Sequence, residues 1–121
     1  PLSVSAAIDV LASMSTEHSV LVLGDMAELG DDAEKMHSDI GSEAKAAGIQ
    51  RLYATGKLGK NTVRAFGDNG FYFEDKTQLI KNLQKDLTGS EVVLIKGSRS
   101  AAMEEVVERI LTQNNNNKRA N

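Results

Sequence analysis

Hydrophobic residues along the chain fall into short continuous runs separated by longer stretches with a helical repeat. The short runs predict four buried strands, at residues 20–23, 51–54, 71–73 and 91–95. In the longer stretches apolar side chains recur every three or four residues, which predicts helices at residues 3–15, 33–47, 57–66, 76–87 and 103–111. Strands and helices therefore alternate along the whole chain.

This alternation predicts an α/β fold, namely a Rossmann-like three-layer sandwich with a mainly parallel sheet and helices on both faces. Ligands of such sheets bind at the carboxyl ends of the strands, so the loops after Leu23, Ala54, Phe73 and Ile95 are candidate sites. We expect one domain over residues 1–113. The polar tail 114–121 offers nothing apolar beyond Ala120 and is predicted to be disordered.

Composition narrows the function classes. The 121 residues are 40% hydrophobic and 26% charged, which suits one globular domain. The formal charge of -3, without a basic stripe, argues against nucleic acid as a partner. No cysteine is present, which excludes disulfides, thiolate metal sites and a cysteine nucleophile. The apolar runs are too short to span a membrane and no signal peptide is evident, so we expect a cytoplasmic location.

The first candidate loop, residues 24–30, reads GDMAELG and lies between a strand and a helix. Asp25 is the first side chain beyond the strand, where a carboxylate can accept hydrogen bonds from sugar hydroxyls or face a metal-bound phosphate. The alternative is a flexible turn with solvated acids. The position after a buried strand favours a sugar or nucleotide contact.

The second candidate loop, residues 96–100, reads KGSRS and precedes the last helix. Lys96, Arg99, the serine hydroxyls and the N–H groups of a helix start would together bind an anion. Gly97 would let the backbone approach that anion closely. In the alternative interpretation Ser98 or Ser100 only caps the helix and the two cations pair with surface acids; the spacing does not decide between the two.

Two other features carry less weight. Residues 56–62, GKLGKNT, look like a phosphate-binding P-loop, but Ala54 and Asn61 stand where that pattern needs Gly and Ser or Thr. His37 lies beside the apolar stripe of its helix, where a structural role is more usual than a catalytic one. With two histidines far apart, a zinc site is not expected.

The segments LGDMAELG (23–30) and KGSRSAAME (96–104), together with His37, resemble the C-terminal domain of the Mur ligases, in the branch that adds D-alanyl-D-alanine. The similarity extends over roughly residues 1–112. It implies an ATP-dependent amide-bond ligase that joins D-alanyl-D-alanine to UDP-N-acetylmuramoyl-tripeptide in bacterial peptidoglycan synthesis. In this family the γ-phosphate of ATP converts a carboxylate to an acyl phosphate, and the incoming amine displaces phosphate.

The resemblance also implies site residues. Asp25, with Gly24, would approach the ATP ribose, and the segment Lys96, Gly97, Ser98 and Arg99 would lie near the carboxylate of D-alanyl-D-alanine. Glu28 and His37 are possible site residues without an assigned role. No catalytic or metal-binding residue is expected in this domain, because the P-loop and the Mg²⁺ ligands belong to the central ATPase domain, its expected partner in a monomeric enzyme.

One departure from the family matters. The family's Asn-Ala-Asn-Pro signature would end at Pro1, so its asparagines and the strand before them are expected to be missing. We therefore expect residues 1–121 alone to be inactive. Two other hypotheses remain: a stand-alone flavodoxin-like module that binds an anion or nucleotide, and a structural scaffold. The binding module accounts for the KGSRS loop but not for the GDMAELG loop.

Overall fold

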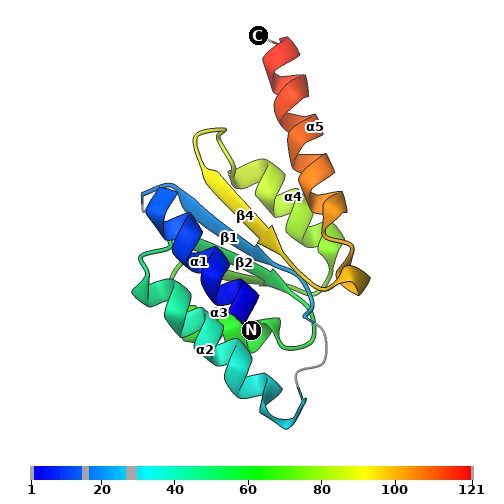
Figure 1. The fold of residues 1–121 in the computed structure, drawn as a ribbon. Helices are drawn as coiled ribbons and strands as arrows, with labels where there is room; N and C mark the ends of the chain where they lie inside the picture. Colours follow the sequence, from blue (N-terminus) through cyan, green and yellow to red (C-terminus); the bar gives the residue numbers. More distant parts are fainter. Residues whose placement is uncertain (1, 15–16, 27–29, 121) are drawn as a thin grey trace.

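A four-stranded parallel sheet forms the centre of the molecule (Figure 1). The computed structural model describes residues 2–14, 17–26 and 30–120, and the side chains of 4–14, 17–26 and 30–112. The strands are β1 (Ser19–Leu23), β2 (Arg51–Thr55), β3 (Gly70–Phe73) and β4 (Val92–Lys96). Their order across the sheet is β3-β2-β1-β4, and each neighbouring pair is parallel. The predicted α/β fold with a parallel sheet is confirmed.

The described residues also form five helices and two short 3-10 turns, which precede, connect and follow the strands. The helices are α1 (Leu2–Met14), α2 (Ala33–Ala46), α3 (Gly59–Phe66), α4 (Lys76–Asp86) and α5 (Glu104–Ala120), and the turns are η1 (Gly30–Asp32) and η2 (Arg99–Ala101). The backbone of α5 is helical to Ala120, and Asn121 lies outside the described residues. The disorder expected for residues 114–121 stays a prediction. Once a helix is nucleated, each added residue gains one hydrogen bond, and this stretch contains no Gly or Pro to stop it.

The two faces of β1 bury different clusters, and this sets the three layers. Leu21 and Leu23 belong to a cluster with apolar residues of α1, α2 and α3. Val20 and Val22 point to the opposite face and pack with residues of α4 and α5. All five residues of β1 are buried, because it is paired on both sides and covered on both faces. Figure 1 shows α1 and α2 on one side of the sheet and α4 and α5 on the other.

Local sequence signals set some of these boundaries. Asp75 caps α4, since its Oδ1 accepts a hydrogen bond from the Gln78 N–H at 2.8 Å. Gly48 follows α2 with φ at 86°, a left-handed conformation that suits glycine and ends the helix. Gly41 allows α2 and α3 to pack closely, because a side chain there would collide with the carbonyl of Thr62.

The order in which the chain adds strands to the sheet reverses at β1. From β1 the chain passes through α2, β2 and α3 to β3 on one side, and then returns through α4 to β4 on the other side of β1. The loops that leave the neighbouring strands β1 and β4 therefore diverge from each other, because one leads to α2 on one face of the sheet and the other leads to α5 on the opposite face. In open α/β sheets this switch point is where ligands bind, at the carboxyl ends of the strands.

Candidate ligand site at the carboxyl ends of the strands

The two candidate loops lie in direct contact at the switch point. Leu23 is aligned with Lys96 in the parallel register, and the Gly24 N–H donates to the Lys96 carbonyl at 2.8 Å. One residue further along, the N–H and the hydroxyl of Ser98 both donate to the carbonyl of Asp25, each at 2.9 Å. Asp25 and Ser98, which are 73 positions apart in the sequence, thus lie in contact. Together the two loops, at residues 24–25 and 96–99, form one rim at this edge of the sheet, and Arg99 directly follows Ser98 on it.

Met103 packs beneath both loops and is only 6% exposed. A side chain on Gly24 would collide with its sulfur, and a Cβ on Gly97 would lie 2.7 Å from its Cγ. The sequence assigned Gly97 to close approach of an anion. In the structure its small size is already required by the packing of Met103, which the sequence showed only as part of a helical stripe.

The KGSRS loop does not open the last helix, and this part of the prediction is wrong. Residues Arg99–Ala101 form the short 3-10 turn η2, and α5 begins only at Glu104. The first turn of α5 carries Glu104 and Glu105, which oppose an anion at that end. Ser98 makes no side-chain cap because its hydroxyl is engaged with the carbonyl of Asp25. Attraction of an anion to this loop therefore rests on its side chains and not on a helix terminus.

Lys96 and Arg99 supply that attraction. Within the part of the chain whose side chains are described, neither forms an ion pair or a side-chain hydrogen bond, so the alternative of pairing with surface acids is not seen. Both line an open pocket of about 380 Å³, formed by residues 95–99, Met103, Glu104 and Val107. The acidic residue of that lining is Glu104. The two cations outnumber it, and a pocket with a net positive charge suits an anion.

The ends of β2 and β3 form the wall on the other side of Asp25. Gly56 has φ at 105°, and a Cβ there would lie 2.8 Å from the Asp25 Cα. The Tyr72 hydroxyl donates to the Gly56 carbonyl at 3.2 Å, and Lys60 lies 5.4 Å from the centre of the Tyr72 ring. Burial raises the pKa of Tyr72, and the negative charges of Glu74 and Asp25 add to the effect.

This wall was not found from the sequence. Residues 56–62 attracted attention there only as a rejected P-loop, although a glycine directly after a strand at the ligand edge was a usable signal. The register of the sheet was needed to place Gly56 against Asp25, since no sequence spacing relates the two positions.

The remaining predicted site residues are not joined to this rim. His37 is 6% exposed and its Nδ1 is hydrogen-bonded to the Ala33 carbonyl at 2.7 Å, within α2 itself. That contact suits the structural interpretation of His37. Glu28 lies outside the described residues.

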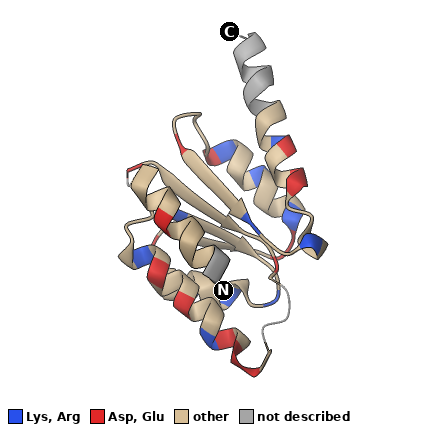
Figure 2. Ribbon diagram, in the orientation of Figure 1, with Lys and Arg blue, Asp and Glu red and all other residues tan. Residues whose placement is uncertain are grey.

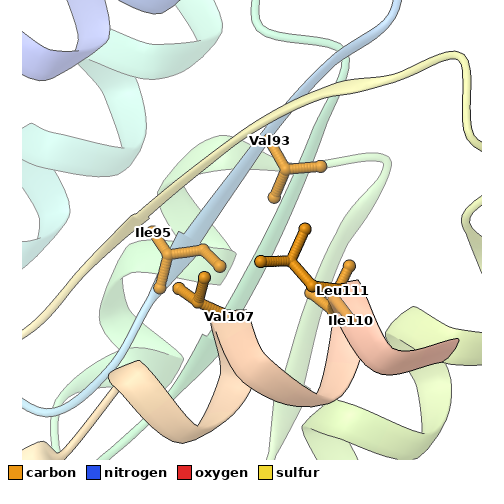
Figure 3. A pocket seen from close by; sticks show the side chains of 5 residues that line it. All are labelled: Val93, Ile95, Val107, Ile110 and Leu111. Carbon is orange, nitrogen blue, oxygen red and sulfur yellow. The ribbon is translucent and has the colours of Figure 1, made fainter. Parts of the chain in front are cut away.

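Another pocket, of about 220 Å³, lies between β4 and α5 and is lined by apolar side chains (Figure 3). Its lining comprises Val93, Ile95, Val107, Ile110 and Leu111. It therefore offers no group for a phosphate or a carboxylate. Acidic and basic residues are interspersed along the helices (Figure 2). Among the residues described, no cluster of His, Cys, Asp or Glu suits a metal ion, and no helix has the length and apolar character needed to cross a membrane.

Comparison with known proteins decides the family. Residues 1–99 match the family model described as Mur ligase, glutamate ligase domain. The chain belongs to this family. The Mur ligase resemblance noted in the sequence is thereby confirmed.

Relatives of the Mur ligase domain carry one recurring name. UDP-N-acetylmuramoyl-tripeptide--D-alanyl-D-alanine ligase of Escherichia coli is 49% identical over 93% of this chain and 25% of its own length. The ligase of the same name from Buchnera aphidicola is 34% identical over 92% of this chain and 24% of its own length. The chain thus spans about a quarter of these relatives. MurF from Acinetobacter baumannii shares the fold, with a TM-score of 0.73 and 24% identity over 88% of this chain and 25% of its own.

Proposed function

We propose that this Mur ligase domain is the C-terminal part of an ATP-dependent ligase that joins D-alanyl-D-alanine to UDP-N-acetylmuramoyl-tripeptide in peptidoglycan synthesis. The observation that carries the proposal is the rim itself. Ser98 bonds twice to the Asp25 carbonyl, so the loop of Asp25 and the loop of Lys96 and Arg99 share one edge of the sheet. Neither cation is paired with any of the described side chains. The names of the relatives supply the tripeptide and the dipeptide as substrates. The rim supplies cations for the carboxylate of the dipeptide and a carboxylate for ATP.

Each loop has a separate task in this proposal. Asp25 accepts hydrogen bonds from the ribose hydroxyls of ATP, while Lys96 and Arg99 hold the terminal carboxylate of D-alanyl-D-alanine through charge-assisted hydrogen bonds. The free amine of the dipeptide then attacks the carbonyl carbon of the acyl phosphate. An amide bond forms, phosphate leaves with the electron pair of the broken C–O bond, and the amine loses a proton. The domain contributes by binding and orienting the amine.

Mg²⁺ is assigned no step in this domain, because the described residues offer it no cluster of ligands. We assign the metal and the phosphates of ATP chiefly to a central ATPase domain, as the family resemblance implies. The enzyme would act as a cytoplasmic monomer, in which the present domain closes over ATP and delivers the dipeptide. A stand-alone anion-binding module is the alternative, and it leaves the Asp25 loop without a task.

Ligand titration of the chain labelled with ¹⁵N tests the proposal. We expect D-alanyl-D-alanine, at millimolar concentration because half of the site is absent, to shift the amide signals of residues 96–102. ATP should instead shift the signals of residues 24–26. The matched control is D-alanyl-D-alanine amide, which lacks the terminal carboxylate and should shift residues 96–102 far less.

Enzymatic assay of residues 1–121 alone completes the test. We expect neither ATP hydrolysis nor amide formation, and phosphate release that depends on D-alanyl-D-alanine would contradict the division of labour between domains. Shifts in neither loop would favour a scaffold. Equal shifts with the dipeptide and its amide would remove Lys96 and Arg99 from the recognition of the carboxylate.

A further inference from the structure

Lys76, the first residue of α4, reaches across to the segment that follows the KGSRS loop. Its Nζ donates to the carbonyls of Ala101 and Ala102, at 3.1 and 3.2 Å, and pairs with Glu105 Oε1 at 3.1 Å. Its side chain is 27% exposed. An ammonium has three N–H donors, and each of them has a partner here. The residue is therefore fully engaged with the protein and is not available to a ligand.

The backbone that Lys76 holds is in an unfavourable conformation. Ala102 has φ at 50° and ψ at 50°, in the left-handed region, which a residue with a Cβ seldom adopts. Such a conformation persists only where surrounding contacts impose it, and it is concentrated at functional sites. The ammonium of Lys76 is one such contact, because it binds the carbonyl oxygen of Ala102 and that of the preceding residue.

Arg99 lies between two fixed points of this segment. On one side Ser98 is tied to the Asp25 carbonyl by its N–H and its hydroxyl. On the other side the N–H of Ala102 donates to the Arg99 carbonyl at 3.1 Å, and Ala102 is in turn held by Lys76. If the second point is released, the turn can relax towards an ordinary conformation and carry Arg99 away from its place in the pocket.

We propose that Lys76 is a positioning residue for the Lys96 and Arg99 pair, and through it for the carboxylate of the acceptor dipeptide. This inference rests on the proposed function and adds a residue from a third segment of the chain to that site. The competing interpretation is that Lys76 only joins α4 to α5 through Glu105. The two interpretations differ in what they predict for the dipeptide and for ATP, because a purely structural link would affect the binding of both alike.

The test uses the full-length ligase that carries this domain, with steady-state kinetics and thermal unfolding. Lys76→Met keeps much of the side-chain volume but removes all three donors. We expect it to raise the KM for D-alanyl-D-alanine about tenfold or more while the KM for ATP changes less than about twofold. Lys76→Arg retains charge and donors and should restore part of the loss. Lys81→Met on the exposed side of the same helix is the matched control and should change neither KM.

Arg99→Met, measured in parallel, separates the two levels of the proposal. If Arg99→Met raises the KM for the dipeptide and Lys76→Met does not, the positioning role is refuted and the dipeptide site stands. If Arg99→Met also has no effect, the dipeptide site itself is refuted, and the role of Lys76 falls with it. If Lys76→Met raises both KM values equally and lowers the unfolding midpoint, Lys76 is only a structural link. Glu105→Gln, which leaves the two carbonyl bonds in place, should keep most of the affinity for the dipeptide.

Discussion

Met103 is the residue on which the geometry of the rim depends. It fills the space beneath Gly24 and Gly97, and neither position has room for a methyl group. Because β1 and β4 are hydrogen-bonded neighbours, any displacement of Met103 would move both loops together. The Met103 side chain therefore fits in this place only because positions 24 and 97 are both glycine.

This close packing predicts that Met103→Ala partly compensates the stability loss caused by Gly24→Ala. Gly24→Ala should lower the free energy of unfolding by about 1–3 kcal/mol, because the added methyl overlaps the Met103 sulfur. Met103→Ala alone should cost about 2–5 kcal/mol through the cavity it leaves. The double variant should lose clearly less than the sum, since the new methyl enters space that the methionine has vacated. Urea denaturation measures all three; strict additivity would contradict direct packing between the two positions.

Asp25, Lys96 and Arg99 could be placed on one edge from sequence, because the loops that carry them follow apolar runs that were identifiable as strands. Met103 and Lys76 could not. Their roles come from contacts between segments that are far apart in sequence, and such contacts leave no mark on local spacing. The KGSRS loop was expected to supply the N–H groups of a helix start, and it forms the tight turn η2 instead. The pattern of apolar residues begins at Met103 and says nothing of that turn.

At the scale of elements, Glu91 closes the connection between α4 and β4. Its carboxylate accepts hydrogen bonds from the N–H groups of Thr88 and Gly89 and pairs with Arg51 at 2.9 Å. The side chain is 5% exposed. Burial by itself raises the pKa of Glu91, but the backbone N–H groups and Arg51 outweigh it and hold the pKa below its usual value.

A pH dependence follows from this shift. A carboxylate whose pKa is lowered in the folded state stabilises the protein above its unfolded pKa of about 4.3, and that contribution disappears as the pH falls through the folded value. We expect Glu91→Gln to cost about 1–3 kcal/mol at pH 7, and the difference from the native sequence to shrink as the pH falls below about 4. Urea denaturation between pH 7 and pH 3 measures this.

Glu108→Gln is the matched control for that series, because Glu108 is exposed on α5 and forms no hydrogen bond or ion pair with the described residues. It should change stability little at any pH. A Glu91→Gln penalty that stayed constant down to pH 3 would show that the carboxylate acts through its shape and not through its charge.

Most elements were predictable because their burial patterns are simple. The four strands begin and end within a residue or two of the predicted runs, and the Asp75 cap fixed the start of α4. The order of the strands was not predictable from periodicity, because it depends on which side of β1 each connection crosses. The disorder expected for residues 114–121 from their polar composition stays a prediction, since a helix that packs against nothing is marginally stable.

At the scale of the molecule, one sheet joins two cores that share no helix. Leu21 lies in the core beneath α1, α2 and α3, and Leu79 lies in the core beneath α4 and α5. The candidate site draws on both sides, since the loop after β1 precedes α2 and the loop after β4 precedes α5. The rim can keep its geometry only if the two cores are stable together.

We therefore expect the domain to unfold in one cooperative transition. Leu21→Ala and Leu79→Ala, both fully buried positions on opposite faces, should each lower the free energy of unfolding by about 2–5 kcal/mol and leave the slope against urea unchanged. Far-ultraviolet circular dichroism follows all helices, whereas tyrosine fluorescence, measured in a Tyr72→Phe background in which Tyr53 is the only tyrosine, reports the α4 and α5 side. The two signals should coincide in both variants. An earlier fluorescence transition with a reduced slope in Leu79→Ala would show that α4 and α5 can detach alone, and the KGSRS loop would then move independently of Asp25.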